Sequence, residues 1–135
     1  MDLMQRRREL LMGVKKNLAP PLSQWQDGYI NGAGGIDAFN PNGELYSPYV
    51  RVDAGRVYKF SYTMSAIPAN TYWASICFYD ESYTRVGNRI APGTSNTLYD
   101  VFGEAPNGAK YMRMSFRSYG IATSVSLVES RLPAE

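Results

Sequence analysis

The sequence predicts an all-β fold, a jelly-roll-type β-sandwich that follows one short N-terminal α-helix. Its 135 residues contain 11 Tyr, 5 Phe and 2 Trp, and strands are enriched in aromatic side chains. Its 12 Gly and 8 Pro separate short apolar stretches at intervals typical of sandwiches and barrels. A helical repeat of apolar residues occurs only near the N-terminus, so the rest of the chain is expected to form strands.

Composition and charge exclude several classes of function. The chain has 14 Lys and Arg against 12 Asp and Glu, and a net charge of +2 argues against a dedicated nucleic-acid-binding protein. It has no His, which excludes enzymes that need a His-based triad, zinc-bound water or a two-His iron site. The single cysteine, Cys77, follows Ile76 in an apolar stretch and is therefore predicted to be a small buried hydrophobic residue. No stretch is long and apolar enough for membrane insertion.

Residues 1–16 are predicted to form the helix. Asp2 lies in its first turn and Lys15 and Lys16 lie near its end, where the helix dipole favours these charges. A helix this short is marginal in water, so its apolar stripe is expected to dock on its own domain, on copies of itself or on a neighbouring protein. We expect a homo-oligomer, and a trimer in particular. The stripe consists of Leu3, Met4, Leu10, Leu11 and Val14.

Two prolines mark the boundary between this helix and the β domain. Pro20 and Pro21 stop the helix and favour an extended connection, so residues 17–23 are predicted to be a linker and residues 24–135 the sandwich. Turn sequences such as Asn31-Gly32 then divide the domain into strands. The predicted strands are Gly28–Ile30, Ile36–Phe39, Val50–Val52, Arg56–Met64, Thr71–Tyr79, Thr84–Ile90, Thr97–Phe102, Lys110–Arg117 and Ile121–Val128.

Alternation assigns faces to the longest predicted strands, because successive side chains point to opposite sides of a sheet. The inward positions are predicted to form the core. They include Phe60, Ile76, Phe78, Met114 and Phe116. The same alternation sends another four residues to the outward face, where they meet if their strands are neighbours. These are Trp73, Tyr79, Arg113 and Arg117.

Three segments carry a resemblance to a known family: LYSPYVRVDAGRVYKFSYTM, WASICFYDESY and GEAPNGAKYMRMSF. Together they resemble the carbohydrate-binding-module-like β-sandwich of tail, baseplate and fibre proteins in phages and prophages of Firmicutes. One departure is that Asp53-Ala54-Gly55 replaces the usual Pro-Gly turn, which changes the stiffness of that turn. The N-terminal MDLMQRRRELLM also resembles the start of small prophage tail proteins. The matching positions are Tyr46–Val52 with Gly55 and Tyr58, Ile76–Asp80, Ala105-Pro106, Ala109–Tyr111 and Arg113.

The resemblance implies a virion protein of the tail or fibre whose sandwich binds a host-surface glycan. Binding without turnover is expected, so no residue is assigned a catalytic role. The expected partners are host glycan, other virion proteins and further copies of the chain. The run Arg6 to Arg8 is followed by Glu9 instead of a continuous apolar core, so synthesis in the bacterial cytoplasm without a signal peptide is expected. The alternative is a purely structural oligomeric virion protein whose aromatic face forms subunit contacts.

The first candidate ligand-binding residues are Trp73, Tyr79, Arg113 and Arg117. Aromatic rings cover the apolar faces of sugars, and planar polar side chains hydrogen-bond to sugar hydroxyls. In the alternative interpretation, the two aromatic residues fill a second apolar layer and the arginines are ordinary solubilising charges.

Two further pairs of residues are weaker candidates. Trp25 and Tyr29 form a second aromatic pair, although a Trp near the first strand more often closes the end of a sandwich. Asp80 and Glu81 follow the central predicted strand and are a weak candidate for structural Ca²⁺. An ordinary polar turn is the favoured interpretation, and no other metal or cofactor is expected.

Overall fold

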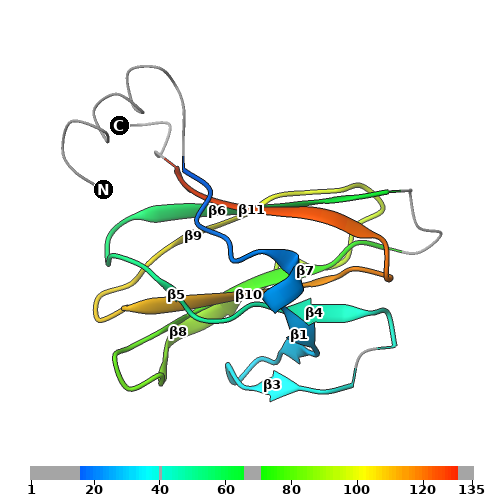
Figure 1. Ribbon diagram of the computed structural model, residues 1–135. Helices are drawn as coiled ribbons and strands as arrows, with labels where there is room; N and C mark the ends of the chain where they lie inside the picture. The colour runs from blue at the N-terminus through cyan, green and yellow to red at the C-terminus, as the bar shows by residue number, and fades with distance from the viewer. Residues whose placement is uncertain (1–15, 40, 66–70, 131–135) are drawn as a thin grey trace.

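Two antiparallel sheets face one another across an apolar core in the computed structural model of the chain (Figure 1). The structure describes residues 16–39, 41–65 and 71–130. The large sheet has six strands in the order β1-β4-β10-β7-β8, with β5 also paired to β10, and the small sheet has the order β11-β6-β9. The all-β prediction is confirmed, and the arrangement is consistent with a β-sandwich. The jelly-roll topology stays a prediction.

The elements differ greatly in length. The large sheet contains β1 (Gln26–Asp27), β4 (Glu44–Tyr46), β5 (Val50–Arg51), β7 (Ala74–Tyr79), β8 (Arg85–Ile90) and β10 (Tyr111–Arg117). The small sheet contains β6 (Val57–Met64), β9 (Val101–Glu104) and β11 (Ala122–Ser130). A separate hairpin joins β2 (Tyr29–Ile30) to β3 (Ile36–Asp37), and a 3-10 turn, η1, spans Leu22–Gln24.

The start of the described chain lies along β11. The predicted N-terminal helix falls outside the described residues except for Lys16. In the predicted linker, the Leu18 amide donates to the Leu127 carbonyl at 2.7 Å. The Asn17 side chain accepts from the Leu127 amide at 2.9 Å and donates to the Val125 carbonyl at 3.0 Å. Residues 17 and 18 thus continue the hydrogen bonding of the small sheet at its edge (Figure 1).

The predicted strands agree with the observed ones to within a few residues. Each predicted strand overlaps an observed strand, whereas β1 and β4 have no predicted counterpart. These two strands contain two and three residues, too few to show a period of two in the sequence.

The core lies between the inner faces of the two sheets. All five residues predicted for it are buried, each at most 1% exposed. Trp25 closes one end of this core: its ring lies 5.4 Å from that of Phe116, and its indole N–H donates to the Pro20 carbonyl at 2.9 Å. Gly103 on β9 is required by close packing, because a Cβ atom there would lie 2.4 Å from the Ile76 Cδ1 atom. Within the described residues, no helix is long and apolar enough to cross a membrane.

The outer face of the large sheet is covered in its middle by the β2–β3 hairpin. Ile30 of the hairpin packs with Cys77 and Tyr79 in a second, smaller buried cluster. Its amide donates to the Ser115 hydroxyl at 3.2 Å, and the Tyr79 hydroxyl donates to the Gly34 carbonyl at 2.8 Å. The prediction that Cys77 is buried is therefore confirmed.

The prediction that Tyr79 lies on an exposed outward surface is wrong. Alternation places Tyr79 on the outer face of β7 as expected, but its side chain is only 2% exposed. The reason is that a sheet face is accessible only where nothing packs on it, and here the hairpin and Tyr49 cover the ring. For Tyr79 the alternative interpretation, a second apolar layer, is the correct one.

Candidate functional site

The four first-choice candidates all lie on the outer face of the large sheet, but the structure does not bring them into one site. Trp73 and Arg117 lie at one end, where the Arg117 amide donates to the Trp73 carbonyl at 3.0 Å. Arg113 lies further along β10, opposite Cys77 of β7. Tyr79 lies at the far end of β7, opposite Tyr111, and is buried against the hairpin tip. The hairpin therefore separates two surfaces, each with its own aromatic residues and arginines.

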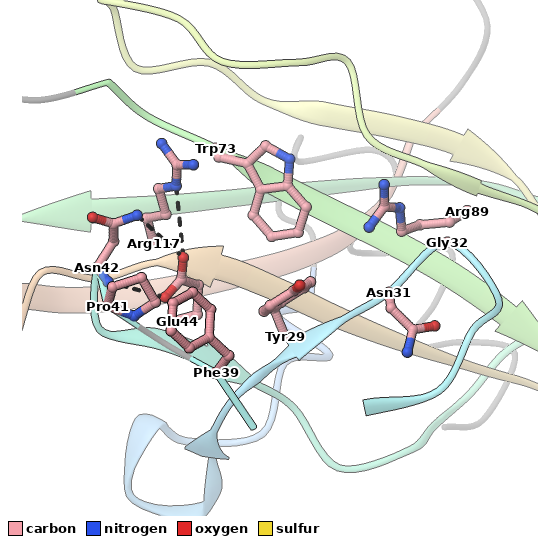
Figure 2. A pocket seen from close by; sticks show the side chains of 10 residues that line it. All are labelled: Tyr29, Asn31, Gly32, Phe39, Pro41, Asn42, Glu44, Trp73, Arg89 and Arg117. Atoms are coloured by element: carbon pink, nitrogen blue, oxygen red, sulfur yellow. Dashed lines mark hydrogen bonds and ion pairs between the residues drawn. The ribbon is translucent and has the colours of Figure 1, made fainter. Parts of the chain in front are cut away.

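A cleft of about 470 Å³ opens beside Trp73 and Arg117 (Figure 2). We call it the Trp73 cleft. It is bordered by the hairpin, by the segment that leads into β4, and by the ends of β8 and β10. Its lining residues are Tyr29, Asn31, Gly32, Phe39, Pro41, Asn42, Glu44, Trp73, Arg89 and Arg117.

Three aromatic rings contribute to the Trp73 cleft. Tyr29 packs edge-to-face against Trp73, with the ring centroids 5.8 Å apart. The Tyr29 hydroxyl donates to Asp37 Oδ2 at 3.1 Å, and this hydrogen bond raises the pKa of Tyr29 above its usual value. Phe39 is 70% exposed, which is unusual for a large apolar side chain. The Trp73 cleft thus offers apolar ring surface to a ligand.

A pair of opposite charges also lines the Trp73 cleft. The Glu44 carboxylate lies 3.7 Å from Arg117 Nε and accepts from the Asn42 backbone amide at 3.2 Å (Figure 2). Arg117 Nη1 also donates to the Thr71 hydroxyl at 3.0 Å. Although Glu44 is a buried acidic residue, its charge is compensated by the nearby guanidinium and by hydrogen bonds. Both charged groups are therefore held in place before any ligand arrives.

Arg89 provides a second cation in the Trp73 cleft. Its Nη1 donates to the Ile30 carbonyl at 2.8 Å, which ties β8 to the hairpin. Its guanidinium carbon lies 5.5 Å from the centroid of the Trp73 ring. This distance is within the range of a cation–π contact, so Arg89 helps to orient the Trp73 ring.

Some of the residues that line the Trp73 cleft were predicted from the sequence and others were not. Trp73 and Arg117 come from the first candidate set and Tyr29 from the second, whereas Trp25 is in the core. Glu44 and Arg89 were not predicted. An acidic residue between Gly43 and Leu45 looks like an ordinary loop residue, and only the fold shows that it is buried.

A second aromatic surface lies at the other end of the same sheet face. We call Tyr49, Tyr83 and Tyr111 with Arg51 and Arg113 the tyrosine platform. Tyr83 stacks on Tyr111 with ring centroids 4.8 Å apart and lies 4.5 Å from Tyr49. Arg113 lies over the Tyr49 ring at 3.7 Å.

Asp80, the weak calcium candidate, is used by the turn that carries Tyr83. Its Oδ1 atom accepts from the backbone amides of Ser82 at 2.8 Å and Thr84 at 3.0 Å. This is the polar turn that the sequence analysis favoured for Asp80 and Glu81. In the part of the chain that the structure describes, no group of three or more His, Cys, Asp or Glu residues is placed to hold a metal ion.

Comparison with known protein families and with curated proteins gives no match. The solved structures that show some similarity to the chain include the following three. The enzymatically active domain of tailspike protein 4 from bacteriophage CBA120 is 19% identical, over 68% of this chain and 15% of that chain, with a TM-score of 0.49. A chain in the structure of accessory secretory proteins 1, 2 and 3 of Streptococcus pneumoniae is 14% identical. The match covers 78% of this chain and 96% of that chain, with a TM-score of 0.45.

The third structure holds the CBM22-1 and GH10 modules of a xylanase from Clostridium thermocellum with xylohexaose. It is 15% identical, over 87% of this chain and 28% of that chain, with a TM-score of 0.43. Similarities at this distance carry no argument about function. The assignment of function therefore depends on the residues described above.

Proposed function

We propose that the chain is a virion protein of the tail or fibre of a phage or prophage, and that it binds host-surface glycan in the Trp73 cleft. The observation that carries this proposal is an aromatic cleft with a fixed pair of opposite charges, Glu44 and Arg117, in its wall. The virion setting rests on the sequence resemblance, which also supplies host attachment as the role.

The chemistry of the Trp73 cleft suits a sugar. A pyranose has apolar faces that pack on aromatic rings, which Tyr29 and Trp73 supply. A sugar hydroxyl both donates and accepts hydrogen bonds, and the cleft offers a carboxylate acceptor and a guanidinium donor side by side. Because Glu44 and Arg117 compensate each other, this pair is suited to the uncharged hydroxyls of a sugar, and Arg89 is the remaining cation of the lining.

We infer binding without turnover. Glycosidases use two carboxylates that flank the bond to be broken, one as an acid and the other as a base or nucleophile. Glu44 is engaged by Arg117 and Asn42, and the nearby Asp37 accepts from the Tyr29 hydroxyl and the Phe39 amide. These contacts support a role for both acids in positioning other groups.

Assembly would raise the strength of attachment. One ring contact and a few hydroxyl contacts give weak binding, since each polar contact replaces one with water. Several copies on one particle increase it by avidity, so a homo-oligomer, a trimer in particular, and contacts with other virion proteins belong to the proposal. Deleting residues 1–16 should reduce the mass measured by light scattering and keep the β signal in circular dichroism.

The test is Trp73→Ala in the full-length protein. A thermal melt checks folding, and binding is measured on host cells or purified cell-wall polysaccharide. A folded variant that no longer binds supports the proposal. Phe102→Ala is the matched control, because Phe102 is 53% exposed on the small sheet and should not affect binding.

The alternative role is structural, with the aromatic face as a subunit contact. The exposed ring of Phe39 at the edge of the Trp73 cleft is the observation that favours it. In that case Trp73→Ala would keep any glycan binding and weaken assembly. Solvent access of Trp73 in the assembled protein separates the two roles.

A further inference from the structure

The two arginines of the tyrosine platform have no acidic partner among the residues that the structure describes. Arg113 lies 3.7 Å from the centroid of the Tyr49 ring and 5.6 Å from that of Tyr79, and its Nε atom is buried with no hydrogen-bond partner. Arg51 is exposed, and its guanidinium carbon lies 5.5 Å from the centroid of the Tyr111 ring. Since Arg51 is opposite Tyr111 across the β5–β10 ladder, Arg51 and Arg113 are diagonal neighbours on one sheet face.

The two arginines of the tyrosine platform differ from Arg117 and Arg56, which have acidic partners. Arg117 is paired with Glu44, and Arg56 lies 4.0 Å from Glu129. Neither Arg51 nor Arg113 forms an ion pair within the described residues. A guanidinium in contact with tyrosine rings has lost part of its hydration, and an oxyanion restores both charge balance and hydrogen bonds.

The platform is also arranged before any ligand binds. Tyr83 has φ 64°, a left-handed conformation that is unfavourable for a tyrosine. It is held there by the turn, where its amide donates to the Asp80 carbonyl at 3.0 Å, and by stacking on Tyr111. Its side chain is nevertheless 51% exposed, so the ring presents apolar surface next to the two cations.

We propose that the tyrosine platform is a second binding site, separate from the Trp73 cleft, for a sugar that bears a phosphate or carboxylate group. Arg113 and Arg51 bind the oxyanion, and the exposed ring of Tyr83 packs against the sugar. This second site rests on the proposed function in one point only, namely that the ligand carrying the acidic group is a glycan. The Trp73 cleft, where Glu44 and Arg117 compensate each other and Arg89 is the one further charged side chain of the lining, takes the uncharged part of such a polymer.

The test uses three small probes: glucose 1-phosphate, glucuronate and glucose. Binding is followed by NMR of the full-length protein with labelled tyrosine rings. We expect an acidic probe to shift the Tyr83 and Tyr111 signals in a salt-dependent way, with much weaker effects of glucose. A response to only one acidic probe identifies whether phosphate or carboxylate is the group bound.

Variants locate the site. Arg51→Gln and Arg113→Gln should each weaken binding of the acidic probe by about tenfold. Arg51 is exposed, so its variant should fold even if that of Arg113 does not. Arg56→Gln, at the residue that precedes β6 of the small sheet, is the matched control and should leave binding unchanged.

Two further variants separate this proposal from the proposed function. Tyr83→Gly relieves the left-handed backbone and removes the ring, so a folded protein with weaker binding is expected. Trp73→Ala should leave the acidic probe bound at the platform, even where it abolishes attachment to polysaccharide. The proposal is overturned if Arg51→Gln does not weaken binding of the acidic probe, or if Trp73→Ala abolishes that binding. It is also overturned if the Tyr83 signals change with protein concentration but not with added probe.

Discussion

The two faces of strand β7 are both buried, but different interactions bury them. On the inner face, Ala74, Ile76 and Phe78 pack against the small sheet in the main apolar core. On the outer face, Ser75, Cys77 and Tyr79 are covered by a hairpin with only two residues in each strand. A hydrogen bond from the Ile30 amide to the Ser115 hydroxyl fastens this hairpin, and Ser115 shares another with Ser75 of β7 at 2.6 Å.

The outer face has two separate sites because of the way in which it is covered. The inner face is continuous, because every strand of the two sheets except β1 contributes apolar side chains to it. The outer face is interrupted, because the hairpin crosses it and is held by polar contacts between residues distant in sequence, such as Tyr79 with Gly34. The aromatic residues left on either side of the hairpin become the Trp73 cleft and the tyrosine platform.

The largest expected effect is on the inner face. Phe78→Ala should lower the free energy of unfolding by about 3–5 kcal/mol, because it leaves a cavity in the packed core. Denaturant unfolding measures this loss. Phe102→Ala, at a half-exposed position, should change the same quantity by less than about 0.5 kcal/mol. A loss below about 1 kcal/mol for Phe78→Ala would mean that the inner and outer faces are reversed.

The next effect involves buried tyrosines from both faces. Burial raises the pKa of Tyr62 and Tyr58 on the inner face and of Tyr79 on the outer face. In the unfolded chain a tyrosine loses its proton near pH ~10, whereas these three keep theirs at higher pH when folded. Their contribution to stability is therefore complete below pH ~10 and is lost as pH rises toward the folded pKa values. Denaturant midpoints should be constant between neutral pH and pH ~9 and fall steeply above ~10; a flat profile to pH ~11 contradicts this.

A smaller effect is expected for the outer face alone. Tyr79→Phe keeps the ring and removes the hydrogen bond to the Gly34 carbonyl, which should cost about 1 kcal/mol. The loss should be local, so hydrogen exchange at the Ile30 amide should speed up more than exchange in β6. Equal changes at both places would show that the hairpin does not open independently.

The smallest effect comes from the matching change on the inner face. The Tyr62 hydroxyl is buried without a hydrogen-bond partner, so Tyr62→Phe removes an unsatisfied polar group. Stability should be unchanged or slightly higher, in contrast to Tyr79→Phe. Thermal melts of the two variants, made in parallel, provide the comparison, and a loss for Tyr62→Phe equal to that for Tyr79→Phe would contradict it.

The sequence predicted the inner face well and the outer face poorly, for a physical reason. In β6, β7 and β10 alternation extends over six to eight residues, which is enough to place Phe60, Ile76 and Phe116 in the core. The hairpin strands are two residues each, and no local pattern indicates what they cover. Trp73 could be selected because it is aromatic and because alternation along the strand places it on the outer face. Glu44 and Arg89 could not be selected, because only the folded chain brings them next to Trp73.

We propose that Trp73 contacts ligand, whereas the other tryptophan, Trp25, is a core residue. The most direct test is ¹⁹F NMR of the protein labelled with fluorotryptophan, with the two signals assigned by Trp73→Phe. On addition of host cell-wall polysaccharide, we predict that the Trp73 signal shifts or broadens while the buried Trp25 signal keeps its position. Binding of the polysaccharide with no change in the Trp73 signal would contradict the claim.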